Sequence, residues 1–111
     1  MTKFLVLYNS PIPAAEMMAN MTSEEAKAGM DAWMAWSQKV GNALVDFGLP
    51  LGSNRRIETG SASQGSTQAS GYSIVQAESL DSATKMLEDH PHLQTPGGTI
   101  DVLECLPMPG M

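Results

Sequence analysis

Residues 22–48 read TSEEAKAGMDAWMAWSQKVGNALVDFG and form the only long segment of the chain with a sustained helical period. Thr22 followed three residues later by Glu25 has the form of a capping box, so we expect a helix to begin here. Gly48 before Pro50 is typical of a helix end. Spacings of three and four residues place one set of side chains on a single face, which we expect to be buried. Its members are Ala26, Met30, Trp33, Ser37, Val40, Leu44 and Phe47.

Strand-like sequence flanks this helix on both sides. Residues 3–8 (KFLVLY), 71–77 (GYSIVQA) and 99–106 (TIDVLECL) are short and rich in strand-forming residues. Residues 49–59 predict a weaker edge strand, and the polar residues 60–70 predict a loop or a long hairpin tip. The sequence therefore predicts four strands.

A second, shorter helix is predicted between the last two strands. Ser79 is its expected N-cap, and Pro91 limits it to about three turns, with His90 at its end. The resulting order, βαββαβ, favours a single α+β domain over residues 1–111. We expect a ferredoxin-like fold, in which both helices cover one face of a four-stranded antiparallel sheet.

The open face of such a sheet is expected to be covered as well. The first strand is apolar on both sides, and Val75 and Leu103 add apolar side chains on later strands. A second copy of the chain is the simplest cover. The sequence thus predicts a homodimer, a dimeric α+β barrel, in which two sheets face each other around a central cavity.

Composition limits the partners of the chain. Its 111 residues carry a formal net charge of -6, which opposes phosphate backbones, so we expect no nucleic-acid partner. No apolar run approaches membrane-spanning length, and the N-terminus lacks the features of a secretory signal, so we expect no membrane partner. Cys105 is the only cysteine. It permits no intramolecular disulfide, fits a reducing cytoplasm and is predicted to be a small buried hydrophobe.

Three segments together resemble a known family. They are KFLVLY at 3–8, SGYSIVQAESLDSATKMLEDHPHL at 70–93 and GGTIDVLECLPM at 97–108. These segments are similar to the YCII-related family of small dimeric α+β-barrel proteins, particularly its branch with a DGPF-type loop before the third strand. The resemblance covers nearly the whole chain and implies a ferredoxin-like dimer. It does not imply one activity, although the family members with assigned roles include a dehydrochlorinase-like enzyme of aromatic degradation.

The chain departs from this family in two places. Residues 65–68 (GSTQ) stand where the DGPF signature is expected and lack both its carboxylate and its aromatic ring. Family members proposed to be enzymes resemble one another in a histidine on the first helix and an aspartate just after the second. The matching positions here are Met30 and His90. The family's usual pair is therefore not reproduced, and its mechanism does not transfer whole.

His90 and His92 are the strongest candidates for chemistry, because they are the only histidines and lie in one His-Pro-His turn. Histidine exchanges protons most easily near neutral pH, so one hypothesis is a catalytic general base at the rim of the cavity. The alternative is structural: His90 completes the end of the second helix, and His92 is exposed. A metal site would need a third ligand, such as Cys105 or Asp101, and we predict no metal.

Tyrosine and arginine side chains are the candidates for ligand binding. Tyr8 and Tyr72 come from neighbouring central strands, where both could point into one cavity and hydrogen-bond a ligand, or bond a backbone carbonyl instead. Arg55, next to Arg56, could hold a carboxylate or phosphate, or could blunt an exposed edge strand. Trp36 lies at the edge of the apolar stripe of the long helix, where it could belong to a second contact surface or be partly exposed.

Two hypotheses of function follow. The chain lacks the glycine-rich phosphate and dinucleotide loops, a C-x-x-C pair and a G-x-S-x-G elbow, so we predict no cofactor. The first hypothesis is proton-transfer or lyase-type chemistry on a small aromatic or anionic molecule in the dimer cavity. It uses His90 as base, Tyr8 or Tyr72 as hydrogen-bond partner and Arg55 as anion anchor. The alternative is a non-catalytic ligand-binding or accessory module, which the missing DGPF loop and helix histidine favour.

Overall fold

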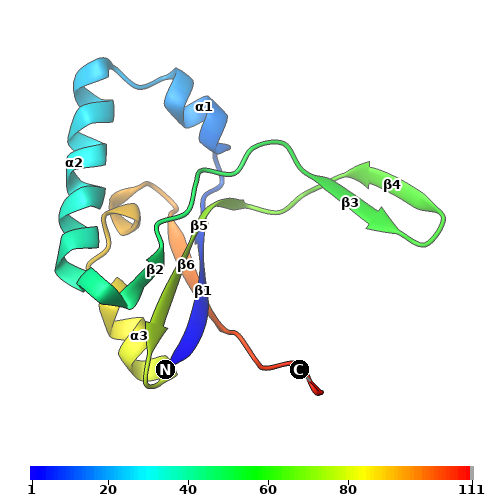
Figure 1. The fold of residues 1–111 in the computed structure, drawn as a ribbon. Coiled ribbons are helices and arrows are strands. Elements are labelled where there is room, and N and C mark those ends of the chain that lie inside the picture. Colours follow the sequence, from blue (N-terminus) through cyan, green and yellow to red (C-terminus); the bar gives the residue numbers. More distant parts are fainter. Residues whose placement is uncertain (111) are drawn as a thin grey trace.

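The computed structural model describes residues 1–110, which form a four-stranded antiparallel sheet with helices on one face (Figure 1). In the spatial order β2-β5-β1-β6, the sheet contains β1 (Thr2–Asn9), β2 (Leu44–Asp46), β5 (Ala69–Ala77) and β6 (Thr99–Glu104). The helices are α1 (Ala14–Ala19), α2 (Ser23–Val40) and α3 (Leu80–Leu87), with short 3-10 helices η1 (Gly41–Ala43) and η2 (Pro91–Gln94). Strands β3 (Arg55–Glu58) and β4 (Ser61–Gln64) form a separate hairpin. This arrangement confirms the predicted ferredoxin-like α+β fold.

The helix predicted over residues 22–48 begins as expected but ends early. The Thr22 Oγ1 atom accepts a hydrogen bond from the Glu25 N–H, and the Glu25 carboxylate accepts one from the Thr22 N–H, so the capping box is confirmed. α2 stops at Val40 because Gly41 takes a φ of 57°, which does not continue a right-handed helix. The following strand β2 pairs with β5. The second strand of the sheet therefore comes from the end of the stretch that was predicted to be helical.

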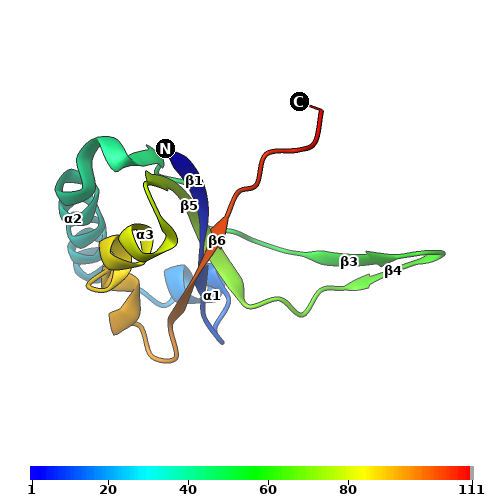
Figure 2. The same ribbon diagram turned by 90° about the horizontal axis from the view of Figure 1, so that it is seen from below.

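The edge strand predicted over residues 49–59 is not part of the sheet beyond an isolated bridge between Pro50 and Gly71. Its second half is β3, which pairs with β4 instead, and residues 60–70 supply β4 and so confirm the hairpin alternative. Figure 2 shows that this hairpin extends away from the sheet on the side opposite the helices. The chain thus inserts a hairpin between the second and third strands of the sheet.

The buried face of α2 differs from the predicted stripe. Trp36 is the one buried residue of the helix, and its Nε1–H donates to the Met86 carbonyl of α3 at 2.9 Å. Of its two predicted alternatives, the structure therefore favours a second contact surface over partial exposure. Trp33 and Val40 pack beside it, whereas Met30 is 57% exposed. The first half of α2 runs past the end of the sheet toward α1 (Figure 1). Its apolar side chains therefore have no sheet to pack against.

The core lies between the sheet and the helices. Along β1 the side chains of Phe4, Val6 and Tyr8 are buried on the helix side, and alternate residues point to the other face. Val75 on β5 is buried with them, which corrects its predicted place on the open face. Leu103 on β6 does lie on the open face and is 44% exposed. No element of the described chain covers that face (Figure 2).

Candidate functional site

Five ring side chains meet between the sheet and the second half of α2. We call this group the His90 cluster, and its members are Tyr8, Trp33, Trp36, His90 and His92. The tyrosine comes from β1, the two tryptophans from α2, His90 from the position just before η2, and His92 from η2 itself. The sequence-predicted residues His90, His92 and Tyr8 are therefore brought together, although Tyr8 lies on the helix side of the sheet and not in a cavity between two sheets.

The His-Pro-His turn is built by a local cap. α3 ends at Leu87 and η2 begins at Pro91. His90 is the N-cap of η2, because its Nδ1 atom accepts a hydrogen bond from the His92 N–H at 3.0 Å. The His92 Nε2–H donates to the Asn9 carbonyl at 2.7 Å. His90 is 1% exposed and His92 is 7% exposed. The structural alternative is therefore corrected in two respects. The His90 side chain caps the following turn, and only its backbone N–H donates to the Leu87 carbonyl at the end of α3, while His92 is buried.

The rings of the His90 cluster pack closely around His90. Its imidazole stacks on Tyr8 with ring centroids 4.7 Å apart, and Trp33 and Trp36 each meet it edge to face at 4.4 Å. The rings of His92 and Trp33 also contact Tyr8, with centroids at 5.4 and 4.8 Å. Such geometries suit aromatic rings, whose faces are negative and whose edges are positive. The imidazole of His90 is thus enclosed by aromatic side chains.

The hydrogen-bond pattern defines what the His90 imidazole can do. Its Nδ1 atom is an acceptor, so in the neutral ring the proton sits on Nε2. That Nε2–H is buried and has no partner among the described residues. Burial, and next the nearby His92, lower the pKa of His90 to about 4, against an opposing effect of Asp89. At neutral pH His90 is therefore an uncharged hydrogen-bond donor, and its only unprotonated nitrogen is already occupied.

Tyr8 begins a short chain of buried hydrogen bonds. Its hydroxyl donates to Ser73 Oγ at 2.8 Å, and Ser73 Oγ donates to the Phe47 carbonyl at 2.7 Å. Burial raises the pKa of Tyr8 to about 12, although the hydrogen bond with Ser73 lowers it in part. The phenol thus stays protonated at physiological pH. Sequence reasoning missed Ser73, whose signal was a polar residue at an inward position of a central strand, beside Val75.

The other predicted ligand-binding residues lie elsewhere. Tyr72 is half-buried on the open face of β5, because neighbouring residues of a strand point to opposite faces, so Tyr8 and Tyr72 do not share a cavity. Arg55 is exposed on the hairpin, where its guanidinium reaches only the Asn54 carbonyl at 3.4 Å. Cys105, predicted to be buried, is exposed after the end of β6. The structure therefore does not join an arginine to the histidines.

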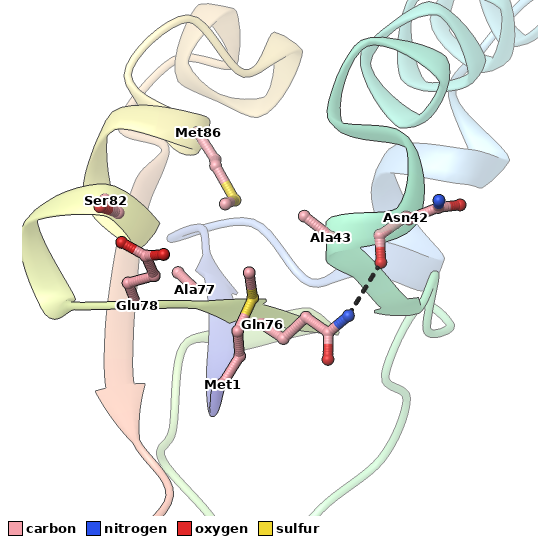
Figure 3. Close-up of a pocket in the computed structure, with 8 residues that line it drawn as sticks. All are labelled: Met1, Asn42, Ala43, Gln76, Ala77, Glu78, Ser82 and Met86. Atoms are coloured by element: carbon pink, nitrogen blue, oxygen red, sulfur yellow. Dashed lines mark hydrogen bonds between the residues drawn. The ribbon is translucent and has the colours of Figure 1, made fainter.

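Two shallow hollows lie outside the His90 cluster. One, of about 250 Å³, opens between η1, the end of β5 and α3, and Figure 3 shows Glu78, Ser82 and Met86 on one side of it, with Gln76 donating a hydrogen bond to the Asn42 carbonyl on the other. The second, of about 340 Å³, lies between α2 and η2 and is lined in part by Trp36 and the Lys39–Asp89 ion pair. Neither is lined by His90.

Two kinds of feature are absent from residues 1–110. No group of three histidine, cysteine, aspartate or glutamate side chains is placed to hold a metal ion. None of the described helices has the length and apolar character needed to cross a membrane.

Comparison with known proteins supports the fold. No protein-family model and no curated protein sequence matches the chain. Among solved structures, it is similar to 5-chloro-2-hydroxyhydroquinone dehydrochlorinase (TftG) from Burkholderia phenoliruptrix AC1100, in complex with 2,5-dihydroxybenzoquinone. The TM-score is 0.50 over 91% of each chain, with 15% sequence identity. This likeness shows the fold, that of ferredoxin-like dimeric α+β-barrel proteins, and the narrower resemblance to the DGPF branch stays a prediction.

Proposed function

We propose that this chain is a homodimeric small-molecule-binding protein that takes an uncharged, planar aromatic molecule of the phenol or quinone class at the His90 cluster. The observation that carries this proposal is the buried Nε2–H of His90, which has no hydrogen-bond partner in the described chain. An unpaired buried donor costs about 1–3 kcal/mol. A ligand oxygen that accepts a hydrogen bond from His90 would remove that cost.

The surroundings of His90 select the class of ligand. Its neighbours are aromatic rings, which favour a flat ring as their partner. No cation lies in the His90 cluster, and Arg55 is on the distant hairpin, so nothing there would neutralise a carboxylate or phosphate. We therefore favour the aromatic part of the predicted ligand class over the anionic part.

Trp33 is the less firmly held of the two tryptophans beside His90. Trp36 donates a hydrogen bond to the Met86 carbonyl, whereas Trp33 is only half-buried and its indole N–H has no hydrogen-bond acceptor among the described residues. If the Trp33 side chain turned outward, a ligand ring could take its place beside His90, where the two rings now meet edge to face at 4.4 Å.

The binding hypothesis is favoured over catalysis by the state of His90. A general base needs a free lone pair, and the Nδ1 lone pair of His90 accepts the His92 N–H while Nε2 carries the proton. Proton-transfer or lyase-type chemistry remains a second candidate, because Tyr8 is a buried phenol hydrogen-bonded to Ser73 and the similar fold includes a dehydrochlorinase. In that case Tyr8 would act as the acid and His90 would orient the substrate.

We also propose that the chain forms a homodimer and that it is located in the cytoplasm. The open sheet face carries apolar side chains that a second copy would bury, as expected for a dimeric α+β barrel. The exposed thiol of Cys105 fits a reducing compartment.

Binding is tested by thermal shift and by quenching of tryptophan fluorescence, with phenol, hydroquinone and 1,4-benzoquinone as uncharged probes and benzoate and cyclohexanone as comparison compounds. A Cys105→Ser background prevents quinones from reacting with the exposed thiol. A ligand at about a hundred times its dissociation constant should stabilise the fold by roughly 2.7 kcal/mol. We expect saturable effects from the phenols or quinones and much weaker effects from benzoate.

Two variants locate the site. His90→Phe keeps a ring but removes the Nε2–H donor, so the ligand effect should disappear. Tyr72→Phe makes a comparable change on the opposite face of the sheet and should leave binding unchanged. If no probe binds, or if His90→Phe binds as well as the parent, the binding proposal is wrong. Consumption of a probe by the parent protein that Tyr8→Phe abolishes would favour the catalytic candidate instead.

A further inference from the structure

The β3–β4 hairpin is almost entirely uncovered. All residues of both strands are exposed, and Ile57 is 80% exposed. The pairing Arg55↔Gln64 and Ile57↔Ala62 places these four residues on one side of the ribbon, because alternate residues share a face. That side carries an apolar centre beside an arginine. Glu58, Ser61, Ser63 and Arg56 form the other, polar side.

The hairpin points to one particular side of the molecule. In Figures 1 and 2 the helices lie on one face of the sheet, and the hairpin and the segment after β6 both extend on the opposite side. The radius of gyration, 15.5 Å, exceeds the roughly 13 Å of a compact domain of about this size. The hairpin therefore projects beyond the open face of the sheet, which is the face that the proposed dimer would bury.

We propose that the β3–β4 hairpin is a docking arm that lies against a second copy of this chain in the homodimer. The inference rests on the homodimer of the proposed function and adds the part of the chain that holds it. A lone two-stranded hairpin is marginally stable in water and gains from packing against another surface. Any molecule seated on the open face of one copy is flanked by that copy's hairpin, so the arm is placed to contact it.

Charge identifies a second copy as the partner. Arg55, on the apolar side of the ribbon, is one of only two arginines of a chain whose net charge is -6, so this side of each arm offers positive charge to a largely acidic body. A two-fold dimer makes this contact twice, because each copy supplies one arm and one body. The apolar side chains of the open face, such as Leu5, Leu7 and Ile74, are complementary to the same face of another copy. Sheet face and arm would then form one continuous interface.

Sedimentation velocity over a range of protein concentrations tests the arm. Ile57→Asp places a charge on the apolar side of the ribbon, where it has no effect on the packing of a single copy. We expect this variant to raise the dimer dissociation constant by about tenfold or more, because an apolar contact would be lost and a charge buried. Ser63→Asp adds the same charge on the polar side of the arm and should change the constant much less.

An arm deletion separates the two parts of the interface. The Gly65 N–H donates to the Asn54 carbonyl at 3.4 Å, so a Gly-Gly link can replace residues 55–64 without straining the ends. We expect the shortened chain to keep its far-ultraviolet circular dichroism and to dimerise more weakly than the parent. If it and Ile57→Asp both dimerise as tightly as the parent, the arm proposal is wrong while the sheet-face dimer stands. A monomeric parent overturns both, and the ligand assay is independent of either result.

Discussion

The imidazole of His90 stacks on the phenol of Tyr8, with ring centroids 4.7 Å apart and planes inclined by 29°. Both rings are buried, and burial favours the uncharged form of each. It lowers the pKa of His90 to about 4 and raises that of Tyr8 to about 12. The rings of His90 and Tyr8, at the centre of the His90 cluster, are therefore both neutral at physiological pH. An ionised ligand bound beside these two rings would meet no compensating charge from them.

The buried His90 makes stability fall in mild acid. Its folded-state pKa of about 4 lies below the ordinary value of 6.5, so the unfolded chain binds the proton more readily. The stabilising contribution is complete above pH 6.5 and is lost as the pH falls from 6.5 toward 4. We expect the free energy of unfolding to drop by roughly 2 kcal/mol across this pH window. Urea unfolding at a series of pH values measures this drop as a falling midpoint.

His90→Asn is the matched control for this pH dependence. Asparagine can still cap η2 by accepting from the His92 N–H, but it does not titrate. The variant should be less stable at pH 7, because the ring is lost, and should show a shallower decline between pH 6.5 and 4. Carboxylates titrate in both proteins, so the difference between the two curves isolates His90. Parallel curves would contradict the burial of a neutral histidine.

The Tyr8 to Ser73 hydrogen bond predicts non-additive mutations. Ser73→Ala leaves the Tyr8 hydroxyl without an acceptor and the Phe47 carbonyl without a donor, so it should destabilise the fold by about 1–3 kcal/mol. Tyr8→Phe should then cost less in the Ser73→Ala background than in the parent, because the stranded hydroxyl is removed. Urea unfolding of the two single variants and the double variant measures the coupling. Additive costs would show that the two hydroxyls do not interact.

We predict that no other residue can replace Gly48, because the Tyr72 backbone leaves no room for a side chain there. Its φ is 81°, and a Cβ atom built there would lie 1.6 Å from the Tyr72 carbonyl oxygen. Gly41→Ala is the control, because Gly41 also has a positive φ but faces open space. We expect Gly41→Ala to cost about 1–3 kcal/mol and Gly48→Ala to cost more than about 4 kcal/mol. Equal melting temperatures for the two variants would refute the close approach.

The sequence predicts the fold because its strongest local signals agree with the tertiary structure. The two N-caps, Thr22 and Ser79, and the central strands β1 and β5 lie where pattern and turn chemistry place them. The predicted C-terminal end of α2 was wrong because the apolar period continues past Gly41. Only the pairing with β5 decides that Leu44 belongs to a strand. Periodicity does not reveal where a helix stops having a sheet beneath it, so Met30 was expected to be buried and is not.

The candidate site was predictable in its residue types but not in its assembly. His90 and His92 attract attention by rarity, and Tyr8 by its place on a central strand. Which face a strand residue occupies depends on register, and that fixed Tyr8 toward the helices and Tyr72 away from them. Arg55 was separated from the site by a hairpin that the sequence showed only as a polar stretch. The predictions for Tyr72 and Arg55 therefore differ from the structure because both depend on how distant segments of the chain pack together.

The two helix N-caps make a final, contrasting prediction. The Thr22 side chain and the Ser79 side chain each accept a backbone N–H, from Glu25 and Ser82 at 3.1 Å, so Thr22→Ala and Ser79→Ala remove similar hydrogen bonds, each worth about 1 kcal/mol. The two helices differ in how their first turns pack against the rest of the domain.

The first half of α2 is exposed and runs past the sheet, so losing the Thr22 cap should fray that segment without unfolding the core. Helix α3 packs on the sheet through the buried Ala83 and Leu87, so losing the Ser79 cap should lower the stability of the whole domain. Hydrogen exchange should therefore speed up locally in residues 23–30 of Thr22→Ala while its urea midpoint stays near that of the parent, whereas the Ser79→Ala midpoint falls. If Thr22→Ala lowers the midpoint as much as Ser79→Ala, the first half of α2 must be packed against a surface that a single copy does not provide.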